Sequence, residues 1–368
     1  MEALNITARA QAARGLPASY YTSAAVFAEE MERIFSRHWL CVGRASALGN
    51  AGDYVLADVC GESVIVVRGA DAVLRAFYNV CRHRGTRICT EPAGNLRGAL
   101  QCPYHAWTYG LDGRLISARN MQDVPGFNTA DYALAPVALA TWEGFVFVCL
   151  DVQAPFAQAY APLSEKFARW HLPELRSAKR IEYDLRCNWK LVFQNYSECY
   201  HCPLIHPALN ALSPWDSGRN DMTSGAFLGG FMTLRPGSRS MTMDGRSSRP
   251  LLGRLDAADA GRVYYYTLFP TVLLSLHSDY VMVHRVIPVE AARTRVVCEW
   301  LFDRDAAAAA GFDCSDAVDF WDMTNRQDWH ACELSQLGLG SRAYQPGPYS
   351  NSEALLAAFD SHYLDLMG

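Results

Sequence analysis

Two short pairs of metal-ligand residues constrain this chain more than any other feature of its sequence. One residue separates Cys81 from His83, and after eighteen further residues Cys102 and His105 follow with two residues between them. Two thiols and two imidazoles in such short pairs indicate one metal centre held by two loops. In a [2Fe-2S] cluster with mixed ligands, two thiolates bind one iron and two imidazoles bind the other. Each loop would then supply one ligand to each iron.

A structural zinc site uses the same ligand types and is the alternative interpretation. Zinc pairs are usually separated by roughly two to four residues, whereas only Arg82 separates Cys81 from His83. The sequence His83-Arg84-Gly85 also suits a tight cluster-binding turn, so the spacing favours the cluster. Cys89 lies between the pairs but outside the pattern, and we expect it to be a packed thiol.

A second candidate metal centre lies in the run from Asn195 to Pro207, which contains His201 and His206. Five residues correspond to about 140° around an ideal helix, so a continuous helix could not direct both imidazoles at one ion. Two prolines, Pro203 and Pro207, interrupt the run. We therefore expect a helix over 189–200 to end at His201, and a turn to bring His206 back so that both imidazoles converge on one ion. Two histidines and one carboxylate on one face of Fe(II) leave positions open for O₂.

Both patterns resemble those of Rieske non-haem iron oxygenase α subunits, and the cluster pattern matches in full. The resemblance implies an enzyme, a monooxygenase or dioxygenase, whose cofactors are a [2Fe-2S] cluster and a mononuclear Fe(II). That family takes its third iron ligand from a later helix, and Asp328 is the matching position. From the sequence alone, three neighbouring carboxylates compete with it: Asp319, Asp322 and Glu333.

Glu198 matches the family position that bridges two subunits, between His201 of one chain and His105 of the next. The resemblance therefore implies a homo-oligomer, usually a trimer. A glutamate here resembles the branch that oxidises quaternary amines such as choline, carnitine and betaines; the alternative is a glutamate on a helix surface. Cys199 and Cys202 form a Cys-x-x-Cys pattern that overlaps the motif, and we expect packed thiols.

The chain contains no Gly-x-Gly-x-x-Gly fingerprint following a strand, so it is not expected to take hydride from a nicotinamide directly. The resemblance implies an NAD(P)H-dependent reductase of the flavin and ferredoxin type as partner. The expected activity is O₂-dependent hydroxylation or oxidative N-demethylation of a small organic substrate, with a quaternary amine or betaine favoured. Alternatives are an aromatic ring-hydroxylating dioxygenase, an O-demethylase and, remotely, a non-enzymatic small-molecule-binding protein with structural zinc.

The expected fold is α+β, with an all-β Rieske domain and a helix-grip type catalytic domain that has an antiparallel sheet and a long C-terminal helix. We expect an N-terminal arm and helix at 1–38, the Rieske domain at 39–154 and the catalytic domain at 155–368. Periodicity predicts helices and strands in the catalytic region. The helices are 162–170, 189–200 and 315–337, and the strands are 263–276, 281–289 and 294–302.

Aromatic residues of the catalytic region could offer ring faces to a cationic ammonium group or enclose an arene. The same alternation over 264–284 is typical of any core hairpin. The candidates for the substrate pocket are Phe227, Phe231, Tyr266, Phe269, Trp300 and Trp321.

Composition excludes other classes of function. The formal charge of −5 and the pI near 6.1 argue against nucleic-acid binding. No apolar run approaches the ~20 residues needed to cross a bilayer, and residues 1–20 lack the pattern of a secretory signal. Twelve cysteines are too few for a disulfide scaffold in a chain of 368 residues. We therefore expect a cytoplasmic protein without membrane or nucleic-acid partners.

Overall fold

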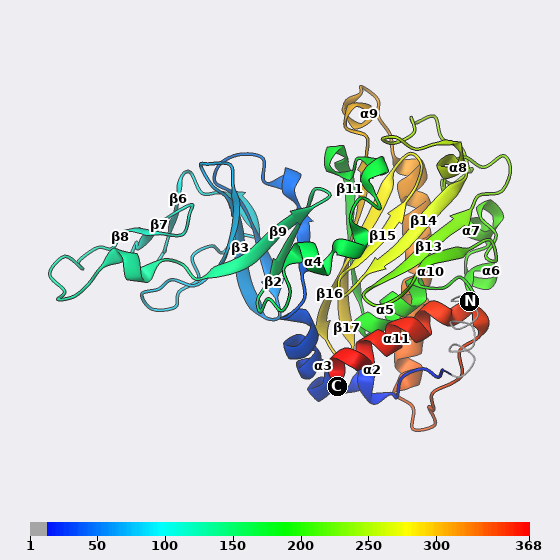
Figure 1. Cartoon of the computed structure of the whole chain (residues 1–368), viewed down its shortest axis with the longest axis horizontal. Helices are drawn as coiled ribbons and strands as arrows, with labels where there is room; N and C mark the ends of the chain where they lie inside the picture. Colours follow the sequence, from blue (N-terminus) through cyan, green and yellow to red (C-terminus); the bar gives the residue numbers. More distant parts are fainter. Residues whose placement is uncertain (1–12) are drawn as a thin grey trace. The chain divides into compact units, whose positions relative to one another are not determined.

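The computed structural model describes residues 13–368, which form two compact units (Figure 1). The smaller unit spans 35–160, and the larger one combines the described residues up to 34 with 161–368. The predicted domain limits, residues 39 and 154, lie within six residues of this division. The first twelve residues of the predicted N-terminal arm lie outside the described part of the chain, as does most of the segment considered for a secretory signal.

The smaller unit is the expected all-β domain. Its main sheet has the strand order β1-β10-β9-β4-β3-β2-β5, and a second sheet has the order β6-β7-β8. Continuous apolar runs in β3 and β10 fit strands that are buried on both faces. The strands are β1 (Leu40–Arg44), β2 (Asp53–Val59), β3 (Glu62–Arg68), β4 (Leu74–Tyr78), β5 (Ala93–Asn95), β6 (Ala99–Gln101), β7 (Thr108–Gly110), β8 (Leu115–Ser117), β9 (Pro136–Trp142) and β10 (Phe145–Cys149), with the short helices η2 (Ala45–Ala47), η3 (Thr129–Tyr132) and α4 (Phe156–Ala159).

The larger unit contains a seven-stranded antiparallel sheet of order β11-β17-β16-β15-β14-β13-β12. The strands are β11 (Arg176–Leu185), β12 (Arg219–Ser224), β13 (Phe227–Thr233), β14 (Arg262–Leu268), β15 (Val272–Leu276), β16 (Val281–Glu290) and β17 (Arg293–Phe302). From β12 to β17 each strand pairs with the next along the chain, so the sheet is a meander with β11 added at one edge. The mixed α+β fold expected from the sequence is confirmed.

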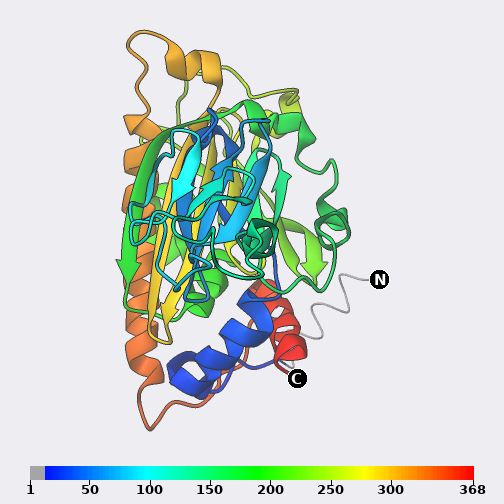
Figure 2. The same ribbon diagram turned by 90° about the vertical axis from the view of Figure 1, so that its left-hand side faces the viewer.

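Helices α5 (Trp189–Tyr196) and α10 (Ser315–Leu339) pack on one face of this sheet. Figure 2 shows α10, in orange, running along the length of the sheet. The other helices of this unit are α2 (Ser19–Thr22), α3 (Ala24–Glu30), η1 (Met31–Phe35), η4 (Ala161–Leu163), η5 (Ala168–Trp170), η6 (Leu172–Glu174), α6 (Cys202–Ile205), α7 (Pro207–Leu212), α8 (Ala257–Ala260), α9 (Arg304–Ala308), η7 (Asn351–Glu353) and α11 (Ala354–Met367).

Three predicted elements of this unit need correction. The predicted strand 263–276 is two strands, β14 and β15, because the chain turns at Phe269–Pro270. The predicted helix 162–170 is only the short turns η4 and η5, since Glu165 between them has a φ of +60°. The helix predicted over 189–200 ends at Tyr196.

A buried ion pair fixes the start of α5. Glu30 and Lys190 have no exposed side-chain surface and contact each other directly. The indole N–H of Trp189 and the hydroxyl of Tyr363 also donate to the Glu30 carboxylate, at 2.8 and 2.6 Å. Burial lowers the pKa of Lys190 to about 8, although Glu30 partly opposes this shift. Removing one partner of a buried pair typically costs about 3–5 kcal/mol, so this contact ties α3 and α11 to α5.

Within residues 13–368, every helix is too short or too polar to cross a lipid bilayer.

Candidate metal centres and substrate cavity

The two predicted cluster loops have the same backbone turn. In each, the cysteine carbonyl accepts a hydrogen bond from the N–H four positions later, that of Gly85 at 3.0 Å and that of Ala106 at 3.1 Å. Both of these residues have positive φ, +74° and +56°. The N–H groups of Cys81 and Cys102 in turn donate to the carbonyl five positions later, at 2.8 and 2.9 Å. The two ligand pairs therefore lie on matching turns although their spacings differ.

These turns bury the thiols and leave the imidazoles at the surface. Cys81 and Cys102 are each 2% exposed, whereas His83 is exposed and His105 is half-buried. The two imidazole rings lie edge to face, with centroids 4.7 Å apart and planes 72° from parallel. The hydroxyl of Tyr109 lies 3.3 Å from the sulfur of Cys81. The two cysteines and the two histidines therefore lie on different sides of the site. A [2Fe-2S] cluster with mixed ligands requires this separation, because the thiolates bind one iron and the imidazoles the other.

Asn79 holds the loop that carries the first pair. This residue is 3% exposed, and its side-chain oxygen accepts the N–H groups of Ile88 and Cys89 at 2.9 and 3.0 Å. Its amide nitrogen donates to the carbonyl of Cys89 at 2.7 Å. The Cys89 thiol is free and buried in the core of this unit, in agreement with the packed thiol expected there.

The second centre brings His201, His206 and Asp328 together, with their ligand atoms all within 4.8 Å of one another. One oxygen of Asp328 lies 2.8 Å from Nε2 of His206 and 3.3 Å from Nε2 of His201. His201 precedes α6, His206 joins α6 to α7, and Asp328 lies on α10. Three separate elements thus direct two imidazoles and one carboxylate at a common point.

The three carboxylates that competed with Asp328 lie elsewhere. Asp322 accepts the hydroxyl of Tyr183 at 2.7 Å, and Glu333 accepts the N–H of Arg186 at 2.9 Å. Asp319, also on α10, does not belong to the group of converging ligand atoms that His201, His206 and Asp328 form.

The outer nitrogen of each imidazole has its own acceptor. Nδ1 of His201 lies 2.5 Å from the Glu198 carboxylate, and Nδ1 of His206 lies 2.7 Å from the side-chain oxygen of Gln327. The Glu198 carboxylate also accepts the N–H groups of Tyr200 and His201. Because these contacts close a turn, α5 ends earlier than predicted. Sequence reasoning did not identify Gln327, which lies next to Asp328 but 121 positions from His206.

These contacts shift the pKa values of His201 and Asp328. Burial opposes the charged form of His201, but its hydrogen bonds with Asp328 and Glu198 outweigh burial and raise its pKa to about 10. Burial likewise opposes ionisation of Asp328, but the two histidines outweigh it and lower the pKa of this carboxyl. Two inward Nε2 atoms, an ionised carboxylate and an acceptor behind each ring fit a divalent iron ion.

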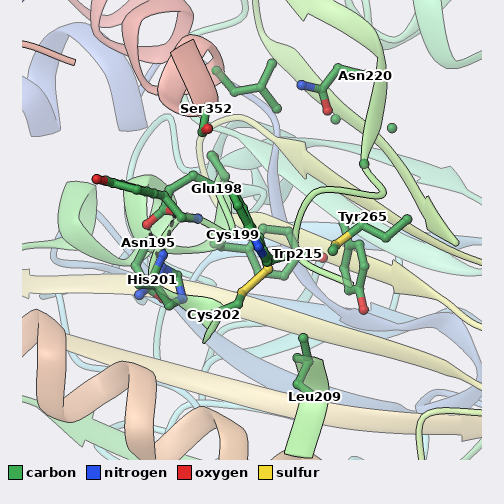
Figure 3. A pocket seen from close by; sticks show the side chains of 18 of the residues that line it. Asn195, Glu198, Cys199, His201, Cys202, Leu209, Trp215, Asn220, Tyr265 and Ser352 are labelled. Carbon is green, nitrogen blue, oxygen red and sulfur yellow. Dashed lines mark hydrogen bonds and ion pairs between the residues drawn. A yellow bond between two sulfur atoms is a disulfide. The ribbon is translucent and has the colours of Figure 1, made fainter. Parts of the chain in front are cut away.

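A cavity of about 410 Å³ opens beside the three converging residues (Figure 3). His201, His206 and Asp328 line it, as do Phe231 and Trp321 of the six aromatic residues predicted for a substrate pocket. The other four predicted residues do not line it and are buried elsewhere: Phe227, Tyr266, Phe269 and Trp300.

The alternation of side chains along a strand explains why Tyr266 does not line the cavity. Along β14, Tyr265 and Thr267 line the cavity, whereas Tyr266 points to the opposite face of the sheet. There the ring of Tyr266 packs against Phe167 with centroids 5.1 Å apart, and its hydroxyl donates to Asp221. Tyr265 and Trp215 were not predicted and add two aromatic side chains to the cavity wall.

Two further features of the cavity wall differ from expectation or were missed. Cys199 and Cys202 form a disulfide across the turn that carries His201, so the expectation of two packed thiols is wrong. Gly229 and Gly230 of β13 leave space for neighbouring strands. A Cβ atom added at Gly229 would lie 2.1 Å from the backbone carbonyl oxygen of Tyr265, and one added at Gly230 would lie 2.0 Å from that of Arg219. Adjacent glycines within a strand signal such a close approach.

Comparison with protein families identifies both units. Residues 38–128 match the Rieske [2Fe-2S] domain, and residues 172–368 match the catalytic domain of the ring-hydroxylating α subunit. The chain is 36% identical over 389 residues to the glycine betaine monooxygenase oxygenase subunit of Chromohalobacter salexigens, covering 97% of this chain and 86% of the relative. It is 41% identical over 209 residues to the carnitine monooxygenase oxygenase subunit of Escherichia coli, covering 56% of each.

Two solved structures align with nearly the whole chain. The quaternary ammonium Rieske monooxygenase CntA in complex with L-carnitine aligns with a TM-score of 0.80 and 28% identity, covering 98% of each chain. Naphthalene 1,2-dioxygenase from Rhodococcus sp. aligns with a TM-score of 0.78 at 20% identity, covering 96% of this chain and 94% of that one. The second likeness shows the shared fold only.

Proposed function

Because this chain belongs to the family of Rieske non-haem iron oxygenase α subunits, we propose that it is the terminal oxygenase of a quaternary-ammonium monooxygenase system. Its substrate would be a small methylated ammonium compound of the glycine betaine or carnitine class. The observation that carries the proposal is the position of His201, His206 and Asp328 in the wall of a cavity with aromatic side chains. Aromatic ring faces attract quaternary ammonium groups.

The proposed metal ligands follow from the two centres. Cys81 and Cys102 would hold one cluster iron, and His83 and His105 the other. His201, His206 and Asp328 would hold the mononuclear iron, which supplies the activation of O₂. Glu198 and Gln327 orient the two imidazoles through their Nδ1 atoms, and such contacts tune the affinity of a site for its metal.

Hydroxylation of an N-methyl group requires a balanced supply of electrons. One oxygen atom of O₂ enters a C–H bond of the methyl group, and the other leaves as water after uptake of two electrons and two protons. The resulting N-hydroxymethyl ammonium releases formaldehyde and a proton and leaves the demethylated amine. In this scheme NAD(P)H is the electron donor, and a separate reductase delivers its electrons.

The route between the two metal centres is also a proposal. A solved structure of a quaternary ammonium Rieske monooxygenase is described as revealing inter-subunit electron transfer. We infer a corresponding route here, from His105 of one subunit through Glu198 to His201 of its neighbour in a homotrimer. The contact of 2.5 Å between Glu198 and His201 supports the second half of this path.

Spectroscopy and a substrate panel test the function. Protein purified with iron should be brown and should give a Rieske-type EPR signal after reduction with dithionite. With a reductase and NADH, glycine betaine, carnitine or choline should stimulate O₂ uptake, with matching formaldehyde if an N-methyl group is removed. Stimulation by naphthalene or a methoxyarene, but by none of the ammonium compounds, would overturn the proposed substrate class and favour the dioxygenase or O-demethylase alternative.

A further inference from the structure

Apart from the histidines of the metal centre, the charged side chains around the cavity are all of one sign. Three carboxylates line it, those of Glu198, Asp216 and Asp328, and no lysine or arginine of the described chain does. A substrate with a net negative charge would therefore find no lysine or arginine side chain of the described residues in this wall. If the substrate is a betaine, its carboxylate has to be bound by uncharged donors.

Most hydroxyl groups of the wall already have hydrogen-bond partners. The hydroxyl of Tyr196 lies 2.8 Å from the Ser275 hydroxyl, and Ser197 donates to the Phe193 carbonyl at 2.6 Å. Thr324 donates to the carbonyl of Phe320 at 2.9 Å, and Thr267 to that of Leu228 at 3.4 Å. These four groups lie in the part of the wall formed by α5, α10 and β14. They have little capacity left to bind a carboxylate.

The amides and hydroxyls of the wall without a hydrogen bond to any described residue are those of Asn195, Asn220, Asn351, Ser352, Tyr200 and Tyr265, and the Tyr265 hydroxyl is buried. Asn195 is on α5, three positions before Glu198. Asn220 lies on the edge strand β12, and Asn351 and Ser352 lie in η7. Those last three are exposed, so they line the outer part of the cavity; Figure 3 labels Asn220 and Ser352 around it.

The cavity therefore has two different ends. At the inner end, the iron-ligand residues lie with Trp321, which is 5% exposed. At the outer end, the uncharged side chains of Asn220, Asn351 and Ser352 are open to solvent, together with the carboxylate of Asp216. Since an oxidised methyl group must lie near the iron-ligand residues, the ammonium group has to occupy the inner end, and the rest of the substrate must extend outward.

We propose that Asn220 and Ser352 determine substrate specificity by binding the end of the substrate opposite the ammonium group through uncharged donors. This inference rests on the proposed function and deepens it. Because these donors carry no charge, they accept either the carboxylate of a betaine or the hydroxyl of a choline-like alcohol. The cavity thereby admits both zwitterions and cations, and its carboxylates exclude anions.

Charge substitutions at these positions give a sharp test. In Asn220→Lys and Ser352→Lys, the KM for glycine betaine should fall about threefold and the KM for choline should rise about threefold, because exposed charge pairs contribute roughly 0.2–1 kcal/mol. Asn220→Asp should shift both KM values in the opposite directions. Lysine is well tolerated on an exposed edge strand, so Asn220→Lys should fold normally.

Ser177→Lys is the matched control. Ser177 is exposed on β11, at the opposite edge of the same sheet from Asn220. A lysine at position 177 therefore adds the same charge about 30 Å from Asn220. Opposite shifts for the two substrates at Asn220 and Ser352, absent in Ser177→Lys, would support the inference. Equal shifts for both substrates, or shifts no larger than those of the control, would overturn it. If the wild-type enzyme oxidised no ammonium compound, the proposed function itself would fail, which is a separate outcome.

Discussion

Nδ1 of His206 lies 2.7 Å from the side-chain oxygen of Gln327, and Gln327 directly precedes Asp328 on α10. Two neighbouring residues of one helix thus contact both nitrogens of the same imidazole. Because the amide oxygen accepts a hydrogen bond, the ring proton belongs on Nδ1, and Nε2 keeps its lone pair for the metal. Gln327 therefore selects the tautomer of His206 that can bind iron.

Gln327→Ala should weaken iron binding at the mononuclear site by about 10- to 100-fold, the usual cost of losing a contact behind a metal-bound histidine. The Rieske EPR signal should not change. Iron content after dialysis against a chelator, measured alongside that signal, separates the two centres. Arg326→Ala is the control, because Arg326 is exposed on the same helix. Equal retention of mononuclear iron in both variants would contradict the assigned role of Gln327.

Local spacing predicted much of the site. Cys81, His83, Cys102 and His105 lie on short loops whose geometry depends on nearby residues. The helix predicted over 315–337 is observed as Ser315–Leu339, because its apolar positions recur with a helical period. Features set by a few adjacent residues could therefore be read from the sequence.

Long-range contacts and strand faces could not be predicted in the same way. In Tyr264-Tyr265-Tyr266 the same residue occupies both faces of β14, so the alternation carries no information about which tyrosine lines the cavity. Likewise, the pairing of Gln327 with His206 depends on how α10 packs against α5 and α6. Only tertiary structure fixes that packing.

Glu198→Gln should keep mononuclear iron bound but slow electron delivery to it. The amide can still accept the N–H groups of Tyr200 and His201, so the turn should persist. It cannot link two imidazoles as an anion. We expect oxidation of the pre-reduced cluster in a single turnover with substrate and O₂ to slow at least about tenfold. Glu333→Gln is the control, since Glu333 accepts the N–H of Arg186 and does not belong to the group formed by His201, His206 and Asp328. Single-turnover oxidation at the wild-type rate would show that Glu198 is not the bridge.

Asn79→Ala should reduce cluster incorporation. The substitution leaves the buried N–H groups of Ile88 and Cys89 without their acceptor, at roughly 1–3 kcal/mol each. Acid-labile sulfide per chain and the Rieske EPR amplitude measure the loss. Asn95→Ala serves as control, because Asn95 also bonds a loop backbone but is exposed. If both variants held the same amount of cluster, Asn79 would not be needed to form the site.

Asp360 should give the larger unit a specific pH dependence. This residue is 4% exposed, and burial raises the pKa of its carboxyl to about 6 from the ordinary value of 3.8, although hydrogen bonds from Tyr349 and Gln194 partly oppose the shift. Between these two pH values the folded state holds a proton that the unfolded chain has lost. The contribution of Asp360 to the free energy of unfolding must therefore fall as pH rises from about 4 to 6 and become constant above it.

Asp360→Asn removes this titration. The stability of the wild type relative to Asp360→Asn should therefore decline by up to about 3 kcal/mol across that range, since one pKa unit corresponds to about 1.4 kcal/mol. Buried histidines such as His277, whose pKa burial lowers, titrate equally in both proteins and cancel in the difference. Urea unfolding of both proteins at pH 4.5, 5.5, 6.5 and 7.5 measures it. A difference that stays constant over these four values would mean that Asp360 ionises normally in the folded state.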